Sequence, residues 1–353
     1  MAFKPSTSRR LSLAFTLSAT LAVGATERLV EPAITMPRMI ERAEEKYPDL
    51  MRRWEVQGDL LTEFTVGVTG EIKNIKMLLS PHPALEYAAV QTLLASKFSP
   101  AKVNGNPATM KLRIPFSFRF DDTSKARLTD SDATFAFPKK PSNELPEAQQ
   151  YDTPPTIKVV PPVVYPRHLL QARKTGRAKL LVMVDDYGTV RGVNVIEATY
   201  PDFGEAAKAM MFAWEFAPAK KAGKAIATTF VFEQKFERTA RDTWITPEAA
   251  KLLRAIESNS DDIVELDALD KRPTARYSPS PIDTRASDAP AEQVVVEFFI
   301  DSDGGVQFPA IKSAKTAELG WAAATALRRW IFEQPTVNGK PAAVRREMQF
   351  DFK

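Results

Sequence analysis

The 353-residue chain has no cysteine and only two histidines, His82 and His168. The absence of cysteine excludes disulfides, thiolate metal sites, cysteine nucleophiles and the lipid-bearing cysteine of a bacterial lipoprotein. The two histidines occupy unrelated positions, so the sequence offers neither a histidine metal cluster nor a catalytic triad. We therefore expect no enzyme, no metal and no cofactor; an enzyme with an unrecognised kind of site is the remote alternative.

The chain also has little excess charge. Its formal net charge of +4 includes three basic residues within the first ten positions. Without residues 1–25, the chain has 45 of its 48 basic residues and all 44 acidic residues, so its net charge is close to +1. Nucleic-acid binding needs a basic face that displaces counterions, and the sequence gives no support for one.

Long hydrophobic runs are missing beyond residues 1–25, which are predicted to be a signal peptide. Basic residues there precede an apolar run, Leu11–Ala25, that ends in small residues suited to cleavage. A membrane-spanning helix needs about 20 apolar residues, and this run is shorter. We expect an exported, periplasmic protein of a Gram-negative-type envelope. The alternative is an uncleaved N-terminus that anchors an energy transducer in the inner membrane, where it couples to a motor complex.

One pattern of residues occurs three times, each time anchored on a glycine. Gly70, Gly188 and Gly304 are each followed by a phenylalanine after 28 residues, a glycine after 35 and a phenylalanine after 48. These residues are Phe98, Phe216 and Phe332; Gly105, Gly223 and Gly339; and Phe118, Phe236 and Phe352. Constant spacing over 48 positions predicts three copies of one structural unit.

Apolar residues alternate on both sides of each anchor glycine, which is typical of two half-buried strands joined in a hairpin. They are Phe64, Val66, Ile72 and Met77 in copy one, Val182, Val184, Val190 and Val195 in copy two, and Phe298, Ile300, Val306 and Ile311 in copy three. The next apolar residues recur every four positions, as on one face of a helix. They are Leu85, Ala89 and Leu93; Phe203, Ala207 and Met211; and Leu319, Ala323 and Leu327.

A proline ends each predicted helix, and a last strand with alternating apolar residues follows. The fold class is therefore α+β, with three β-β-α-β modules, each a small antiparallel sheet with one helix packed on a face. The expected segments are a signal peptide at 1–25, copy one at 35–121, a proline-rich linker at 122–156, copy two at 157–238, a helical or irregular linker at 239–278, and copy three at 279–353. The pair Arg328-Arg329 is expected to be solvated.

The second copy resembles the C-terminal domain family of TonB, the energy transducer. The resemblance rests on Tyr165-Pro166, the strand from Lys179 to Asp185, Tyr187-Gly188, Ala206-Ala207 and Trp214-Glu215-Phe216-Ala217-Pro218. Copy one keeps Tyr47-Pro48 and Phe98-Ser99-Pro100, whereas copy three has Trp330 and Phe332 but lacks the Tyr-Pro opening. The sequence is thus identified as three tandem TonB-like copies.

This resemblance implies a non-catalytic module that binds other envelope proteins and is associated with energised outer-membrane transport. In the family, a short extended peptide of an outer-membrane receptor lies beside the last strand, which is strand addition to an open sheet edge. The implied partner is such a receptor or another envelope protein. The implied binding residues are Ile114, Phe116, Phe118, Phe232, Gln234, Phe236, Met348, Phe350 and Phe352.

Overall fold

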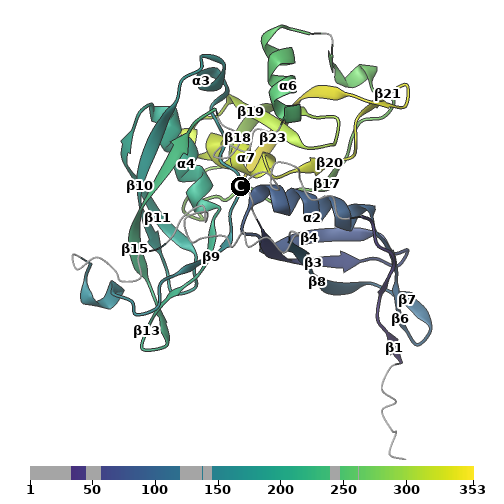
Figure 1. The fold of residues 1–353 in the computed structure, drawn as a ribbon, viewed down its shortest axis with the longest axis horizontal. Coiled ribbons are helices and arrows are strands. Elements are labelled where there is room, and N and C mark those ends of the chain that lie inside the picture. Colours follow the sequence, from purple (N-terminus) through teal and green to yellow (C-terminus); the bar gives the residue numbers. More distant parts are fainter. Residues whose placement is uncertain (1–32, 45–56, 120–136, 138–144, 239–246, 261) are drawn as a thin grey trace, which may run out of the picture.

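The structure, a computed structural model, describes residues 33–44, 57–119, 137, 145–238, 247–260 and 262–353. The predicted signal peptide and Tyr47-Pro48 lie outside the described residues. Figure 1 shows three units, each with a twisted sheet and a helix, arranged around a common centre. We call them module 1 (β1 to β8), module 2 (η1 to β15) and module 3 (β16 to β23).

The main sheet of module 1 has the order β4-β3-β8, with helix α2 on one face, and its short strands form a second three-stranded sheet, β1-β6-β7, and the pair β2-β5. Its elements are β1 (Ile34–Thr35), β2 (Arg38–Glu41), β3 (Gly58–Val66), β4 (Ile72–Leu79), α2 (Pro83–Ala95), β5 (Lys97–Ser99), β6 (Ala101–Val103), β7 (Asn106–Ala108) and β8 (Met110–Phe118). His82 begins α2, because its Nδ1 accepts the Ala84 N–H at 3.1 Å. This histidine therefore has a capping role.

Module 2 repeats this arrangement, with the sheet order β11-β10-β15 and helix α4. Its elements are η1 (Glu147–Gln149), β9 (Thr156–Val159), α3 (Arg167–Gln171), β10 (Gly176–Val184), β11 (Val190–Ala198), α4 (Pro201–Phe212), β12 (Glu215–Ala217), β13 (Ala219–Lys221), β14 (Lys224–Ile226) and β15 (Thr228–Phe236). Helix α6 (Pro247–Glu257) follows and leads into module 3.

Module 3 has the same sheet with one added strand, in the order β19-β18-β23-β16. Its elements are β16 (Ile263–Val264), η2 (Leu266–Ala268), β17 (Ala275–Tyr277), β18 (Glu292–Ile300), β19 (Val306–Ser313), α7 (Ala317–Leu327), β20 (Ile331–Phe332), β21 (Thr336–Val337), β22 (Lys340–Pro341) and β23 (Ala343–Phe352). The structure therefore confirms the α+β class, and each module has the expected β-β-α-β order.

The anchor glycines occupy a backbone position that only glycine fits. Gly70, Gly188 and Gly304 have φ angles of 89°, 86° and 88°, in the left-handed region that side chains avoid. A Cβ atom at these positions would lie 2.2, 2.0 and 2.3 Å from a carbonyl oxygen of Phe98, Phe216 or Phe332, respectively. The hairpin turn thus abuts the short strand after the helix, which explains the constant interval of 28 residues.

Each module begins earlier than its long strands, with a short strand that pairs beside this contact. Strand β2 pairs with β5, β9 with β12 and β17 with β20, so that Met39, Ile157 and Ala275 lie opposite the repeated phenylalanine. Strands β16 and β17 fall within residues 239–278, where a helical or irregular linker was expected. The repeat therefore includes upstream strands whose two to four residues are too short to show an alternating pattern.

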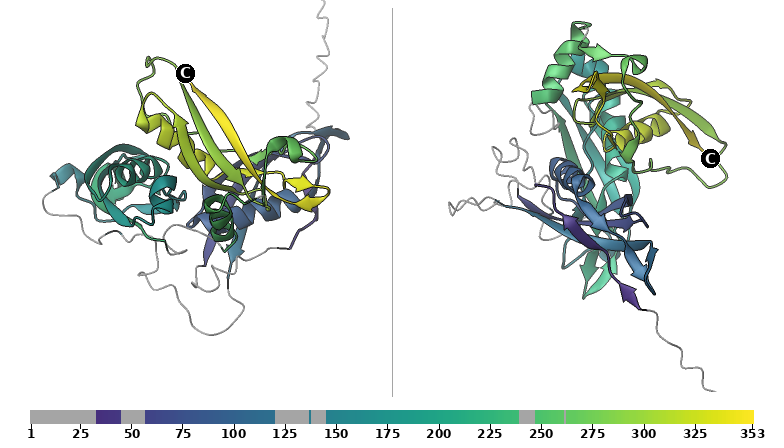
Figure 2. Two further views of the ribbon diagram at one scale, coloured as in Figure 1. Left: turned by 90° about the horizontal axis from the view of Figure 1, so that it is seen from above. Right: turned by 90° about the vertical axis from the view of Figure 1, so that its right-hand side faces the viewer.

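The three modules pack directly against one another. One hydrophobic core runs through modules 2 and 3, and helices α4 and α7 contact each other within it. The core of module 1 includes Tyr277 and Ile331 of module 3. Strand β9 of module 2 continues the edge of module 1, because Ser80 N–H donates to the Lys158 carbonyl at 2.6 Å and Val160 N–H to the Ser80 carbonyl at 3.1 Å. Figure 2 shows module 3 beside both of the others.

A buried ionic network joins modules 1 and 3. The Glu86 carboxylate of α2 accepts hydrogen bonds from Arg329 Nε at 3.0 Å and from the Tyr277 hydroxyl at 2.9 Å. The side chains of Glu86 and Arg329 are only 5% and 14% exposed. Burial, and then the charge of Glu86, raise the pKa of Tyr277. The neighbouring Arg328, expected to be solvated, is also buried and donates to the Val306 carbonyl at 2.6 Å.

We predict that Glu86→Gln destabilises the protein by about 3–5 kcal/mol, because it leaves the Arg329 charge buried without its counter-charge. The urea midpoint of the purified full chain measures this loss. The matched control is Glu41→Gln, since Glu41 pairs with Lys97 at 2.7 Å on the surface, where both side chains are more than 60% exposed. No measurable change is expected for the control. Equal midpoints for the two variants would show that the network does not stabilise the fold.

We also predict that Gly188→Ala costs about 2 kcal/mol or more beyond Gly223→Ala. Both glycines have positive φ, at 86° and 76°, so each alanine carries a similar backbone penalty of about 1 kcal/mol. Only at Gly188 would the new Cβ meet a carbonyl oxygen, whereas no atom lies within 4 Å of that position at Gly223. This clash has to be relieved by a backbone shift. Thermal unfolding of both variants tests the difference, which disappears if the turn relaxes freely.

Candidate functional site

The nine residues implied as a partner-binding site lie on the last strands of the three modules, with their side chains towards the cores. Phe116, Phe118, Phe232, Phe236 and Phe352 are between 0% and 7% exposed. Gln234 is 8% exposed, and Ile114, Met348 and Phe350 are partly buried against the cores. These side chains hold the strands in place, so any contact with an added strand involves the residues between them.

Backbone hydrogen bonds identify which residues of the last strand face outward. Backbone groups point alternately to the two neighbouring strands. In module 2, the Asp185 N–H donates to the Thr189 carbonyl at 2.9 Å, so Asp185 faces β11. Val184 and every second residue before it therefore face β15. The residues of β15 opposite these are Thr228, Phe230, Phe232 and Gln234. Their N–H and carbonyl groups point towards β10, and we call such residues inward.

The same argument applies to the other two modules. Gly67 N–H donates to the Glu71 carbonyl at 2.8 Å, and Asp301 N–H to the Gly305 carbonyl at 2.9 Å. The outward residues are Lys111, Arg113, Pro115 and Ser117 in β8, Thr229, Val231, Glu233 and Lys235 in β15, and Arg345, Glu347, Gln349 and Asp351 in β23. The apolar pattern of each last strand does not mark these residues, because it marks the side chains that face the core. In the sequence, they are the residues that alternate with the inward residues of the last strand.

The outer edge of module 1, strand β8, is polar and lacks one backbone N–H donor. Strand β8 pairs with β3 and with no other described strand. Pro115 is one of its outward residues and has no N–H, which is how edge strands commonly accommodate proline. Beside it, Glu63 of β3 binds Arg113 at 2.8 Å and Lys111 at 3.1 Å. The Arg113 hydrogen bond, followed by that of Lys111, lowers the pKa of Glu63.

The edge of module 3 is partly occupied by its own chain. Strand β16 pairs in parallel with the start of β23, placing Ile263 opposite Ala343 and Val264 opposite Val344. On the outer face of the same sheet, Arg167 of module 2 pairs with Glu297 and lies over the Phe299 ring, 4.9 Å from its centroid. Arg167 also donates to the Phe308 carbonyl at 2.8 Å. This face is therefore covered by module 2.

Among the described residues, no strand pairs with the edge of module 2 over the second half of β15. Near the start of β15, Thr228 Oγ1 donates to the Gln149 carbonyl at 3.0 Å, and Thr229 Oγ1 bonds Gln149 Oε1 at 2.9 Å. No described strand pairs with the outer side of β15. Val231 is 44% exposed there. The Lys235 carbonyl accepts its neighbour Gln234 Nε2 at 2.6 Å.

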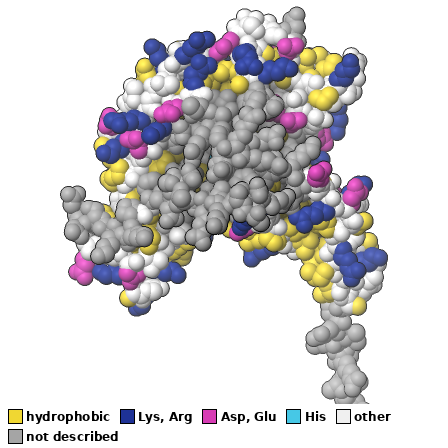
Figure 3. Space-filling model, viewed as in Figure 1, with side chains coloured by type: hydrophobic (Ala, Val, Ile, Leu, Met, Phe, Trp, Pro, Cys, Tyr) yellow, Lys and Arg dark blue, Asp and Glu magenta, His cyan; other side chains and the backbone are white. Residues whose placement is uncertain are grey.

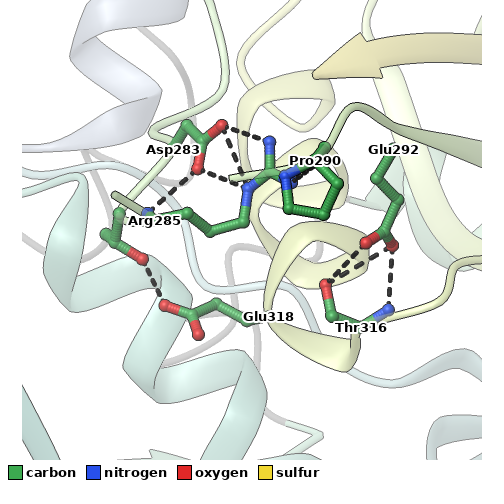
Figure 4. A network of polar contacts seen from close by, with 7 residues as sticks. Asp283, Arg285, Pro290, Glu292, Thr316 and Glu318 are labelled. Atoms are coloured by element: carbon green, nitrogen blue, oxygen red, sulfur yellow. Dashed lines mark hydrogen bonds and ion pairs between the residues drawn. The ribbon is translucent and has the colours of Figure 1, made fainter. Parts of the chain in front are cut away.

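A cleft of about 660 Å³ lies where the modules meet. Its lining includes α4 and β12 of module 2, α7 and residues 280–285 of module 3, and Lys76 of module 1. Figure 4 shows part of its wall, where Asp283 and Arg285 face each other and Glu318 projects from α7. The Arg285 hydrogen bond lowers the pKa of Asp283. Within this wall, Asp283 and Arg285 neutralise each other at 2.8 Å.

The histidine and acidic side chains of the described residues are not gathered into a metal site. Among them there is no group of three or more histidine, aspartate or glutamate side chains placed to hold a metal ion. His168, 66% exposed, lies 3.3 Å from Asp202 at the surface and far along the chain from the His82 cap. On the face drawn in Figure 3, basic and acidic side chains are interspersed around the rim. No helix in the described part of the chain has the length and hydrophobicity that crossing a bilayer requires.

Comparison with known families identifies modules 1 and 2. Residues 43–120 and 161–237 match the family described as the Gram-negative bacterial TonB protein C-terminal. These two segments are therefore similar to the TonB C-terminal domain family, which is a family of protein-interaction domains. Module 3 lies outside the matched residues and shares the element order of the other two. No curated protein matches the sequence.

We predict that the amide hydrogen of Phe232 exchanges with solvent roughly 100-fold or more slowly than that of Val231. The Phe232 N–H points to β10, whereas the Val231 N–H points to the outer side, where no described strand pairs. Native-state hydrogen exchange read by NMR gives both rates in one experiment. Similar protection of the two amides would mean that the outer edge of β15 is covered.

Proposed function

We propose that this protein is a periplasmic TonB-family protein that binds envelope proteins by strand addition. The partner is an outer-membrane receptor or another envelope protein that offers an extended, receptor-like peptide. In this role the protein is associated with energised outer-membrane transport. It works as a binding protein and catalyses no reaction.

The observation that carries this proposal is the open last strand of a TonB-family sheet. Strand β8 in module 1 and strand β15 in module 2 each end their sheet, and no described strand pairs with their outer sides. An added peptide strand would satisfy the outward N–H and carbonyl groups, with side chains supplying selection. Each net hydrogen bond contributes about 1 kcal/mol, so a short peptide binds weakly on its own.

The direct packing of the three modules supports a role in which the protein binds one partner through more than one weak contact. Module 3 contacts both other modules, so the two edges keep a fixed spacing. A contact of the partner with another surface of this body raises the effective concentration of its extended segment for strand addition at one edge. The protein is thereby suited to holding a large envelope partner through short segments.

The proposal predicts that outer-membrane receptor peptides bind the purified full-length protein and shift amide signals of the last strands. The peptides are synthetic segments from the periplasmic ends of receptors encoded in the same genome, and scrambled versions are the control. Binding that shifts signals of β8, β15 or β23 and is lost on scrambling supports the proposal. If no receptor peptide shifts any of these signals at millimolar concentration, and no envelope protein crosslinks to the chain in cells, the proposal is wrong.

A further inference from the structure

The three last strands share one fold but present different outer edges. Aligned on the anchor glycines, Pro115, Glu233 and Gln349 occupy one outward position, and Arg113, Val231 and Glu347 the outward position before it. An added strand needs a donor and an acceptor from each outward residue. The differences at these two positions therefore decide which module can accept a strand.

In modules 1 and 3, local features oppose strand addition. Pro115 removes one of the outward donors of β8, and proline on an edge is a device that discourages further pairing. In module 3, β16 already pairs with the start of β23, and the outward residues beyond it include Glu347 and Asp351. In the described strands of the β4-β3-β8 sheet and of the four-stranded sheet of module 3, no large hydrophobic residue of the outer face is exposed.

Module 2 combines a complete edge with an apolar outer face. Val231, Glu233 and Lys235 all have outward N–H groups, and the carbonyls of Val231 and Glu233 have no other use in the described structure. Val231 lies opposite Leu181, with Met183 two residues further along β10. Leu181, Met183 and Val231 are 37%, 41% and 44% exposed. Together they form an apolar stripe next to the open edge.

The charges beside this stripe indicate the chemistry of a partner. Lys179 and Lys235 are exposed on the same face, and neither lies within ion-pair distance of an acidic side chain of the described residues, although Glu197 and Glu233 stand opposite Lys179 in the register. Arg177, close to both, is paired with Glu197 and Glu233 at 3.5 Å. One end of the edge is therefore basic, while Val231 makes the other end apolar. A peptide strand added beside β15 would complement this edge if it carried an acidic residue facing Lys235 and, four positions away, an apolar residue facing Val231.

We propose that module 2 alone receives the partner strand, on the outer edge of β15, and that it selects an extended peptide with an acidic and an apolar residue four positions apart. This inference rests on the proposed function and identifies its site. Modules 1 and 3 then serve to hold module 2, through β9 and through the helix contact of α4 with α7.

The test uses the full-length protein and two synthetic peptides of seven residues. One has Asp at its second and Val at its sixth position with Thr elsewhere, and the other has Asp and Val exchanged, because the strand direction is open to either order. Chemical-shift titration gives the affinity and the location of binding. At least one peptide is expected to shift the amide signals of Val231, Glu233 and Lys235, and an all-Thr peptide is expected to bind at least about fivefold more weakly.

The decisive variant is Glu233→Pro, which copies the proline that module 1 already carries at the same outward position. It removes one edge donor and leaves the backbone ladder to β10 in place. It also removes the carboxylate that pairs with Arg177 at 3.5 Å, which by itself favours an acidic peptide. A weakening of about fivefold or more is therefore expected from the lost donor. The matched control is Gln349→Pro, the same change in module 3, which should leave binding unchanged. Unaltered amide spectra away from each mutated strand establish that both variants fold.

A charge exchange gives a second, independent readout. Lys235→Glu is expected to weaken binding of the Asp peptide and to strengthen binding of the same peptide with Lys in place of Asp. The inference is overturned if Gln349→Pro, rather than Glu233→Pro, weakens binding, or if the shifts map to β8 or β23. In those cases strand addition itself stands, at another module. If no peptide, including the receptor segments, binds any edge, both this inference and the proposed function fail.

Discussion

The close contact between a glycine turn and a carbonyl oxygen 28 residues later determines the shape of each module. In all three copies a Cβ on the anchor glycine would approach that oxygen to between 2.0 and 2.3 Å, so no side chain fits there. Because the turn is held against the strand after the helix, the chain between them must turn back across the sheet. The helix then covers one face of the sheet, and the last strand returns to pair with the first. A fixed interval in the sequence thus reflects a fixed contact in space.

Around this contact the modules are joined into one body by residues that differ between copies. Arg167 of module 2 covers the outer face of module 3, and the Glu86–Arg329 pair links module 1 to module 3. Strand β9 pairs both with β12 of its own module and with Ser80 of module 1. Buried charges are costly unless they are paired and hydrogen-bonded. Their pairing across the interfaces favours one relative orientation of the modules over others.

The sequence predicted the strands and helices well because their signals are repeated and local. Alternating apolar residues and the interval from Gly188 to Phe216 arise inside one module, and three copies reinforce one another. The short upstream strands and the interfaces could not be predicted in this way. Two basic residues such as Arg328 and Arg329 are equally compatible with solvent and with burial until their partners are known, and Glu86 lies 243 residues from Arg329. The site residues taken from the apolar pattern were the inward half of each strand, since that pattern reports the core.

The outward half of each last strand is where the copies are free to differ. An inward position such as Phe232 has to fill a core, and Met348 of module 3, at the corresponding place, meets the same demand. An outward position faces no core, so Pro115, Glu233 and Gln349 can share one place in the fold. Once three modules are held at fixed positions by their interfaces, an edge that can be extended is a hazard unless it has a partner, because unpaired strands invite association. Pro115 in the edge of module 1 and strand β16 on the edge of module 3 reduce that hazard. The edge of module 2 has neither protection, as expected of an edge that binds a partner strand.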